Sequence, residues 1–233
     1  MPIYCTVPGA FAIFFGLGPQ IARMQRIQPD LFKTSPALPE GFRYQADLIS
    51  RAEEQDLLGH LKQQEFKEFE FHGFLGKRRV VSFGWRYDFN GGGLKKTEAI
   101  PQFLLALRDR AAAFARMDNS ELQQVLLTEY APGAAIGWHK DRSVFGEVVG
   151  FSLASACTFR LRRKTGSTWQ RASILAEPRS AYLLAGPART EWEHSIPAVD
   201  NLRYSITFRN VREHRLRTRA VGPRTQSPRS QKP

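Results

Sequence analysis

Two segments of the chain carry the spacing of apolar residues that is typical of amphipathic helices. In residues 47–66 (DLISRAEEQDLLGHLKQQEF), apolar side chains recur at helical intervals and form one stripe, made of Leu48, Ala52, Leu57, Leu58 and Leu61. Ser50 and Glu53 have the spacing of a capping box, which marks the start of that helix. In residues 99–117 (AIPQFLLALRDRAAAFARM), Pro101 suits a first turn, and a second stripe contains Phe103, Leu104, Leu107, Ala111 and Phe114. We expect both helices to be packing elements.

After Asn119 the helical spacing ends, and short β-type runs follow between clusters of Gly, Pro and Ser. The runs are QVLLTEY, GFSLASACTFRLRR, SAYLLAG and LRYSITFRNV, and they predict antiparallel β structure. Between the two helices, residues 68–94 (EFEFHGFLGKRRVVSFGWRYDFNGGGL) mix strand-forming aromatics with the basic cluster Lys77-Arg78-Arg79 and end near three glycines. A flexible segment that is both basic and aromatic suits contact with bases and phosphates.

The composition indicates one sizeable core. With 233 residues, of which 42% are hydrophobic and 12% aromatic, the chain fits one domain better than two. The only cysteines, Cys5 and Cys157, exclude a disulfide framework and a cysteine-based zinc site, and they favour a reducing, cytoplasmic location. The apolar run Val7–Gly18 resembles the core of a signal peptide but has no basic residue ahead of it. We therefore expect no export, and we favour a start at Met24 with residues 1–23 as an extension.

The charge of the chain favours an anionic partner. The formal net charge is +12 and the pI is near 10.2, so a basic surface would attract a phosphate backbone and release its counterions. Nucleic acid is the leading candidate, and an anionic membrane surface is the second. Between Val211 and Pro233, seven basic residues and one acid, Glu213, supply half of the net charge. We expect this segment to be a solvated tail, with a loose nucleic-acid contact as the second interpretation.

The stretch AAIGWHKDRSVFG, residues 134–146, contains the first candidate metal ligands. On extended backbone, residues two apart point to the same side, so His139 and Asp141 could bind one object together. His194, in TEWEHSIP, lies in another strand-like segment. Two histidines and one carboxylate can form the facial set that holds non-haem Fe(II) with open positions. The alternative is that each histidine is an ordinary structural residue, which is the commoner case for a short His-x-Asp.

The run RYSITFR, residues 203–209, has one polar and one apolar face. The polar residues alternate with the apolar ones, with Arg203, Ser205, Thr207 and Arg209 set against Leu202, Tyr204, Ile206 and Phe208. Two guanidinium groups on an inward-facing surface would be unfavourable unless they met carboxylates, and a dicarboxylate cosubstrate would bind both. The alternative is an exposed strand face with solvated arginines, which this run alone does not exclude.

In order and spacing, these motifs resemble the AlkB-type Fe(II)/2-oxoglutarate dioxygenase family, over roughly Pro39 to Arg212. TEYAPGAAIGWHKD resembles the stretch before the first metal ligand, LISRAEEQDLL the first helix, GKRRVVSFGWRYDF the substrate lid and RTEWEHSIP the region of the distal histidine. The resemblance implies a mainly β fold with flanking helices, in which a nucleotide-recognition lid covers a double-stranded β-helix, or jelly-roll, core. It implies three regions: an N-terminal extension at 1–38, the dioxygenase domain at 39–212 with its lid at about 66–96, and a basic disordered tail at 213–233.

The resemblance also implies a role for each residue that matches a motif. His139, Asp141 and His194 would be the iron ligands. The cosubstrate 2-oxoglutarate would meet Tyr130 and Arg203 at its distal carboxylate, Arg209 at the carboxylate nearest the metal, and Thr128 and Ser205 where family members often have asparagine. With Fe(II), 2-oxoglutarate and O2, the family splits the cosubstrate into succinate and CO2 and hydroxylates an N-methyl group, whose product loses formaldehyde. We therefore expect an oxidoreductase that demethylates alkylated bases in DNA or RNA, as in the repair of DNA damage.

Substrate contacts are expected around the lid. The base would lie between Trp85 or Tyr87 and the ring of His139, although one lid aromatic could equally belong to the core. Phosphate contacts are expected from Lys77, Arg78, Arg79, Arg142, Arg160, Arg162 and Arg163. After Asp141, RSVFG replaces the acidic residues of many repair members, so the preferred base is not implied. Two alternatives stay open, namely the same chemistry on a protein substrate and a non-catalytic basic nucleic-acid-binding module. We expect a monomer that does not bind membranes.

Overall fold

The computed structural model describes residues 37–71, 74–88 and 91–212. The predicted tail, and the predicted extension apart from residues 37 and 38, lie outside these ranges, so the domain boundaries stay a prediction. Within the ranges that are described, no helix is both long and apolar enough to cross a membrane.

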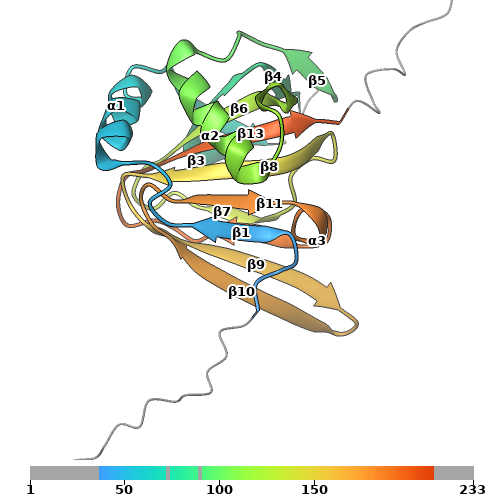
Figure 1. Cartoon of the computed structure of the whole chain (residues 1–233). Coiled ribbons are helices and arrows are strands. Elements are labelled where there is room, and N and C mark those ends of the chain that lie inside the picture. Colours follow the sequence, from blue (N-terminus) through green and yellow to red (C-terminus); the bar gives the residue numbers. More distant parts are fainter. Residues whose placement is uncertain (1–36, 72–73, 89–90, 213–233) are drawn as a thin grey trace, which may run out of the picture. The chain divides into compact units, whose positions relative to one another are not determined.

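Two antiparallel sheets face each other and form most of the fold (Figure 1). The larger sheet has the strand order β1-β11-β8-β13-β6-β3-β2, and the smaller sheet has the order β10-β9-β12-β7. The larger sheet contains β1 (Phe42–Gln45), β2 (Lys67–Phe71), β3 (Phe74–Phe83), β6 (Leu122–Tyr130), β8 (Phe145–Leu153), β11 (Ala181–Leu184) and β13 (Arg203–Val211). The smaller sheet contains β7 (Ile136–His139), β9 (Cys157–Thr165), β10 (Thr168–Ala176) and β12 (Glu193–Ile196). A two-stranded sheet pairs β4 (Trp85–Tyr87) with β5 (Leu94–Lys96), and the predicted antiparallel β structure is confirmed.

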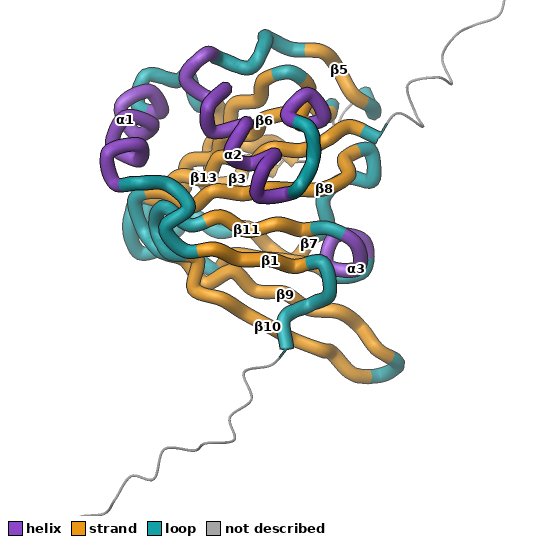
Figure 2. Tube along the Cα trace, viewed as in Figure 1, coloured by secondary structure: helices purple, strands orange, loops and turns teal. Residues whose placement is uncertain are grey.

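Two helices cover the face of the larger sheet that points away from the smaller one (Figures 1 and 2). They are α1 (Arg51–Leu61) and α2 (Leu105–Ala115), and a 3-10 turn at Gln102–Leu104 precedes α2. Leucines of both helices pack on the apolar side of β6, β8 and β13 in a core that includes Leu57, Leu61, Leu104, Leu107, Val125, Leu127, Phe151, Ile206 and Phe208. Both predicted helices are confirmed, although the second begins as a 3-10 turn after Pro101.

A second core lies between the two sheets. It is built around large side chains from both, including Tyr130, Phe159, Leu161, Tyr182 and Trp192. The connections around it include a short helix, α3 (Gly186–Thr190), which leads into β12, and a 3-10 turn at Asn119–Glu121, which leads into β6. The two cores therefore lie on opposite faces of the larger sheet.

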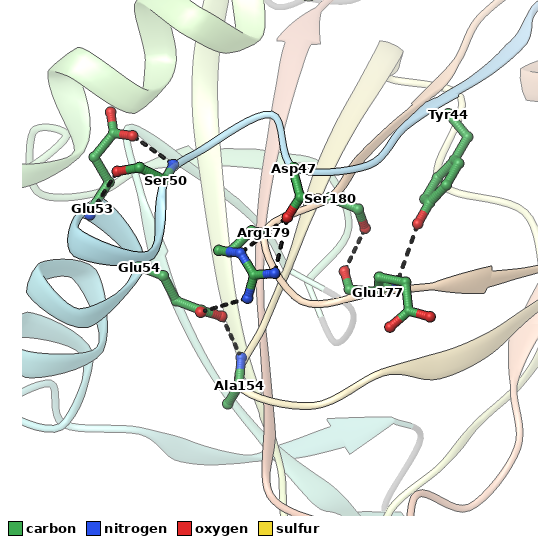
Figure 3. A network of polar contacts seen from close by, with 9 residues as sticks. All are labelled: Tyr44, Asp47, Ser50, Glu53, Glu54, Ala154, Glu177, Arg179 and Ser180. Atoms are coloured by element: carbon green, nitrogen blue, oxygen red, sulfur yellow. Dashed lines mark hydrogen bonds and ion pairs between the residues drawn. The ribbon is translucent and has the colours of Figure 1, made fainter.

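One position of the stripe predicted for α1 is wrong. Ala52 is exposed, and the buried residue near it is Glu54, which is only 4% exposed. Glu54 accepts hydrogen bonds from the Ala154 N–H at 2.9 Å and from Arg179 at 3.4 Å, and Arg179 also donates to Asp47 at 2.9 Å (Figure 3). A carboxylate can take the buried position because these partners satisfy it, which the spacing of apolar residues cannot show.

The three partners in this network share an uncommon backbone conformation. Asp47, Ala154 and Arg179 have φ angles of 47°, 70° and 66°, in the left-handed region. That region is unfavourable for residues with a Cβ atom, so such turns persist where side-chain contacts hold them. The Glu54 network therefore stabilises three turns and fixes α1 against the sheet.

We predict that Glu54→Ala lowers the free energy of unfolding by about 1–3 kcal/mol, because Arg179 and the Ala154 N–H lose their acceptor. Urea unfolding followed by tryptophan fluorescence measures the change. Asp56→Ala, on the exposed side of the same helix, is the matched control and should shift stability by no more than about 0.5 kcal/mol. Equal stability of the two variants would show that the network does not hold α1.

Candidate active site

Neighbouring strands of the smaller sheet bring the two predicted histidines together. His139 on β7 and His194 on β12 are partners in the strand register, and their ring centroids are 4.2 Å apart. Phe159 of β9 stacks on His194 inside the fold, with centroids 5.4 Å apart. The Nδ1 atom of His139 lies 2.9 Å from the carbonyl oxygen of Gly137, which leaves Nε2 as the nitrogen available to a metal.

Asp141 follows β7 and completes the cluster. Its Oδ2 atom lies 3.7 Å from His194 Nε2, and its Oδ1 atom accepts a hydrogen bond from Arg209 at 2.9 Å. Oδ2 is buried and has no hydrogen-bond partner among the described residues. Among the described residues, no group of three or more His, Cys, Asp or Glu side chains is already arranged to hold a metal ion. Neighbouring ligands of a facial set, each about 2.1 Å from the metal, lie about 3 Å apart, and the 3.7 Å between Asp141 Oδ2 and His194 Nε2 is longer than that.

Burial and neighbouring charges set the protonation of this cluster. Burial lowers the pKa of His194 to about 3, with His139 adding to the shift, and burial also lowers the pKa of His139. Burial alone would raise the pKa of Asp141, but Arg209, followed by the two histidines, holds it well below its usual range. At neutral pH the cluster therefore contains two neutral imidazoles and one carboxylate, which are the forms that bind metal ions.

The polar face predicted for residues 203–209 points into the fold. Arg203 is completely buried, at 0% exposure; its Nε donates to Ser152 Oγ at 3.1 Å, and its guanidinium carbon lies 5.0 Å from the centre of the Tyr130 ring. Its Nη1 and Nη2 atoms have no hydrogen-bond partner among the described residues. Unpaired guanidinium nitrogens are unfavourable inside a protein, and one carboxylate could accept hydrogen bonds from both. The alternative of a solvated strand face is wrong.

Arg209 connects the same strand face to Asp141. Its Nη1 donates to Gln124 at 3.0 Å and its Nη2 donates to Asp141, whereas its Nε is buried without a partner in the described ranges. Between the two arginines of β13, Thr128 and Ser205 are register partners, and each is 4% exposed. The inner face of the larger sheet therefore presents polar groups all the way from Arg203 to the cluster.

Arg189, on α3, contributes to the site although the sequence analysis did not single it out. It is 6% exposed and donates three hydrogen bonds, at 2.7–2.8 Å, to carbonyl oxygens after Asp141: that of Arg142 in the loop and those of Phe145 and Gly146 at the start of β8. Because α3 leads directly into the strand that carries His194, Arg189 ties the loop of one candidate ligand to the element before another. Its partners are backbone atoms, so no side-chain motif in the sequence could have indicated it.

The lid aromatics lie beside the loop that follows Asp141. Trp85 and Tyr87 on β4 are half-buried and pack against a small apolar cluster formed by Val144, Phe145 and Val211. The guanidinium carbon of Arg142 lies 4.9 Å from the centre of the Tyr87 ring. Both aromatics therefore have part of the core role that the sequence left open, and both pack against the segment that follows Asp141.

The basic residues predicted to contact phosphate lie on β3, on β9 and, for Arg142 alone, in the loop after Asp141. Arg78 is half-buried on β3 as the register partner of Tyr130, and burial lowers its pKa. Lys77 is exposed, whereas Arg79 pairs with Glu129 at 2.6 Å. The remaining predicted arginines of β9 stack on tryptophan rings, and these are Arg160, Arg162 and Arg163.

Comparison with known proteins gives one family and two similar sequences. A family profile described as the 2OG-Fe(II) oxygenase superfamily matches residues 41–217. The chain is 30% identical over 204 residues to the "Alkylated DNA repair protein ALKBH8 homolog" of Arabidopsis thaliana, covering 72% of this chain and 57% of that protein. It is 29% identical over 131 residues to the "Uncharacterized protein L905" of Acanthamoeba polyphaga mimivirus, covering 51% and 61% respectively. The chain thus spans less than two thirds of either relative. The predicted AlkB-type resemblance is confirmed.

Two solved structures share the fold. The structure of OsALKBH1 superposes with a TM-score of 0.54 at 16% identity, over 75% of this chain and 98% of that one. A Pseudomonas putida prolyl-4-hydroxylase superposes with a TM-score of 0.51 at 15% identity, over 74% of this chain and 93% of that one. At these identities the likeness concerns the fold alone, and it confirms the predicted jelly-roll.

We predict that the metal-free protein loses stability below about pH 6.5, and that His194 accounts for part of the loss. In the folded state the pKa of His194 is about 3, so the ring stays neutral there, whereas in the unfolded chain it takes up a proton. Lowering the pH therefore favours unfolding, by about 2 kcal/mol at pH 5 for this one histidine. Urea unfolding with EDTA at about pH 7 and about pH 5 measures the loss in the wild type and in His194→Asn. A loss of equal size in both proteins would contradict a neutral, buried His194.

Proposed function

Because the chain belongs to the 2OG-Fe(II) oxygenase superfamily, we propose that it is an Fe(II)- and 2-oxoglutarate-dependent dioxygenase that demethylates N-alkylated bases in DNA or RNA. The family uses Fe(II), 2-oxoglutarate and O2. The observation that carries the proposal is the buried Arg203, whose Nη1 and Nη2 have no hydrogen-bond partner in the described residues. Arg209, on the same face of β13, contacts Asp141. The end of this face at Arg203 suits a carboxylate, and the end at Arg209 and Asp141 suits a metal.

The proposed iron ligands are His139, Asp141 and His194. Their donor set fits the metal, because neutral imidazoles and a carboxylate suit non-haem Fe(II) and leave coordination positions open. The buried Asp141 Oδ2, which has no hydrogen-bond partner in the described ranges, supports this assignment. When bound, the iron supplies the oxidising chemistry with O2, while the surrounding side chains supply binding and orientation.

The proposed cosubstrate site lies along the inner face of the larger sheet. Arg203 and Tyr130 would bind the distal carboxylate of 2-oxoglutarate, and Arg209 would bind the carboxylate nearest the metal through its unpaired Nε. Thr128 and Ser205 lie between these positions, and their short hydroxyl side chains reach less far than the asparagines common in the family. Two buried arginines face one carboxylate in this interior, so a dicarboxylate would reduce the excess of positive charge.

The proposed substrate site lies where β4 meets the loop after Asp141. A base taken out of its stack would lie near His139, against Tyr87 or Trp85, with phosphates near Arg78, Lys77 and Arg142. The name of the plant relative, an alkylated DNA repair protein, supports a nucleic-acid substrate. Arg79 would have to break its ion pair with Glu129 to bind a phosphate, so it is the weakest of the lid candidates.

The test of the proposed function is turnover of three substrate classes by protein purified without oxygen and loaded with Fe(II). Methylated single-stranded DNA, methylated RNA and a methylated peptide are each incubated with 2-oxoglutarate and O2, and succinate and formaldehyde are measured. Equal amounts of both products with a nucleic acid support the proposal. Turnover of the peptide alone would favour a protein substrate, and failure to bind iron would favour a non-catalytic binding module.

We predict that His139→Ala, Asp141→Ala and His194→Ala each lose bound iron while staying folded, because each removes one of three donors. Colorimetric iron analysis after gel filtration measures the loss, and circular dichroism checks the fold. His60→Ala is the matched control, since His60 stacks on Phe103 with ring centroids 4.6 Å apart and lies on α1. Iron content at the wild-type level in any of the three variants would refute that ligand.

We predict that Arg203→Ala weakens binding of 2-oxoglutarate by roughly 10–100-fold, because a buried charge-assisted contact to a carboxylate is lost. Arg203→Lys should restore only part of the affinity, since an ammonium group lacks the planar fork of a guanidinium. Anaerobic calorimetric titration of the Mn(II)-loaded protein measures the dissociation constant. Arg116→Ala, at the end of α2, is the control that should bind like the wild type. An unchanged constant in both Arg203 variants would place the distal carboxylate elsewhere.

A further inference from the structure

The side of the smaller sheet that faces away from the candidate metal cluster is basic and aromatic. Side chains alternate along a strand, so the inward-facing His139 and His194 place Trp138 and Glu193 on the opposite side. The register aligns Glu193 with Arg162, so the same outer face continues across β9 and β10. At these strand positions the carboxylate of Glu193 shares the face with four basic side chains, those of Arg160, Arg162, Lys164 and Arg171. Lys140, which follows β7, and Glu191, which precedes β12, lie beside them.

Stacked arginine and tryptophan side chains make part of this face rigid. The guanidinium carbon of Arg162 lies 4.4 Å from the Trp138 ring centre and 4.3 Å from the Trp169 ring centre. Arg160 lies 5.0 Å from Trp138 on the same side, and Arg162 also pairs with Glu193 at 2.6 Å. The guanidinium groups of Arg160 and Arg162 are therefore already in contact with protein groups, and Arg162 packs against the ring of Trp169.

The remaining groups of this face keep capacity for a ligand. Trp169 is 37% exposed. The side chains of Lys164 and Arg171 are exposed, and within the part of the chain that is described neither side chain has a hydrogen bond or ion pair. Arg171 is the register partner of Arg162. Glu193 already pairs with Arg162, whereas no carboxylate pairs with Arg171 among the described residues. A groove of about 360 Å³ lies beside these residues, and its lining includes Lys140, Lys164 and Trp169. Its two carboxylates, Glu191 and Glu193, are paired with Arg163 and Arg162.

We propose that this outer face of the smaller sheet is a second binding surface, separate from the metal site, for single-stranded nucleic acid. A base would stack on Trp169, and the neighbouring phosphates would meet Arg171, Lys164 and Lys140. An exposed aromatic ring among cations binds single strands with little regard to sequence, because every base has a flat face and every linkage a charge. A groove bordered by a rigid ring fits a base and its phosphate better than it fits the plane of an anionic bilayer.

The position of β7 connects this surface to the proposed active site. β7 is an edge strand of the smaller sheet, and its consecutive residues Trp138 and His139 lie on opposite faces. A single-stranded nucleic acid of sufficient length can therefore pass over the edge of the sheet near Lys140. One of its nucleotides would lie at the candidate metal cluster, and the neighbouring nucleotides would lie on the outer face. This consequence rests on the proposed function, whereas binding to the outer face itself does not need iron or turnover.

Binding of a fluorescein-labelled single strand of roughly 20 nucleotides, as DNA and as RNA, tests the surface without iron or 2-oxoglutarate. Trp169→Ala should weaken binding about tenfold through lost stacking, and Trp169→Phe should restore most of it. The double variant Lys164→Ala/Arg171→Ala should reduce the salt dependence of log Kd by roughly 0.7 for each lost phosphate contact. Fluorescence anisotropy measures both effects, and the matched control is Arg51→Ala/Lys62→Ala, which removes two exposed charges from around α1.

Unchanged binding in Trp169→Ala and in the double variant would overturn the proposal, as would an equal loss in the α1 control. Vesicles of phosphatidylserine and phosphatidylcholine form a separate arm, and variants that lose vesicle binding while keeping strand binding would assign the face to membranes instead. Thermal melting checks folding, and the single change Arg171→Ala, at an exposed position, repeats the test if the double variant unfolds.

In active protein, the ratio of kcat/KM on a substrate of roughly 20 nucleotides to kcat/KM on a substrate of about 5 nucleotides should also fall about tenfold in Trp169→Ala. If no substrate turns over, the proposed function fails while the binding result still stands.

Discussion

A guanidinium group that no solvent reaches has to be compensated from within the molecule, and Arg203 imposes this condition on the interior. It lies on β13, between β6 and β8 in the larger sheet, so water cannot approach it from a strand edge. The opposite face of β13 carries Tyr204, Ile206 and Phe208, which pack in the core under the helices. The helices therefore cover that side, whereas the other face of β13, beside the second core, carries polar groups that need a bound partner.

Arg209 is a second buried guanidinium group of β13, and it is compensated by Asp141 in the candidate metal cluster. Its contact with Asp141 joins the larger sheet, which holds the proposed cosubstrate groups, to the loop after β7, which belongs to the smaller sheet. The contact also keeps the pKa of Asp141 low although the residue is buried. Arg189 supports the same loop through its carbonyl oxygens. The ion pair between Arg209 and Asp141 thus joins the two sheets at the point where a metal would lie.

Alternation along single strands could be predicted from the sequence, whereas contacts between distant segments could not. The two faces of β13 followed directly from the order of its residues. On β6 the facing row contains Tyr130, Thr128 and Gln124, with Leu126 as its one apolar member. The pairing of His139 with His194 depends on a register between strands that no local pattern encodes. The residue types allowed the two histidines to share a metal as one alternative, and the family resemblance favoured it. Residues 150–163 form a single β-type run in the sequence, but in the structure they belong to two strands, β8 and β9, because the chain turns after Leu153.

The net charge had pointed to an anionic partner without showing where the basic residues lie. On β13 they point inward, and only a carboxylate or a metal ligand can compensate them there. On β9 and β10, Arg160, Arg162, Lys164 and Arg171 point outward. Arg160 and Arg162 stack on tryptophan rings there, whereas Lys164 and Arg171 are exposed. The same residue type therefore has two different chemical consequences, decided by which side of a strand it occupies. On β7 the consecutive residues Trp138 and His139 lie on opposite faces. One edge strand therefore contributes both to the basic outer face and to the interior, where burial lowers the pKa of His139 and keeps its ring neutral.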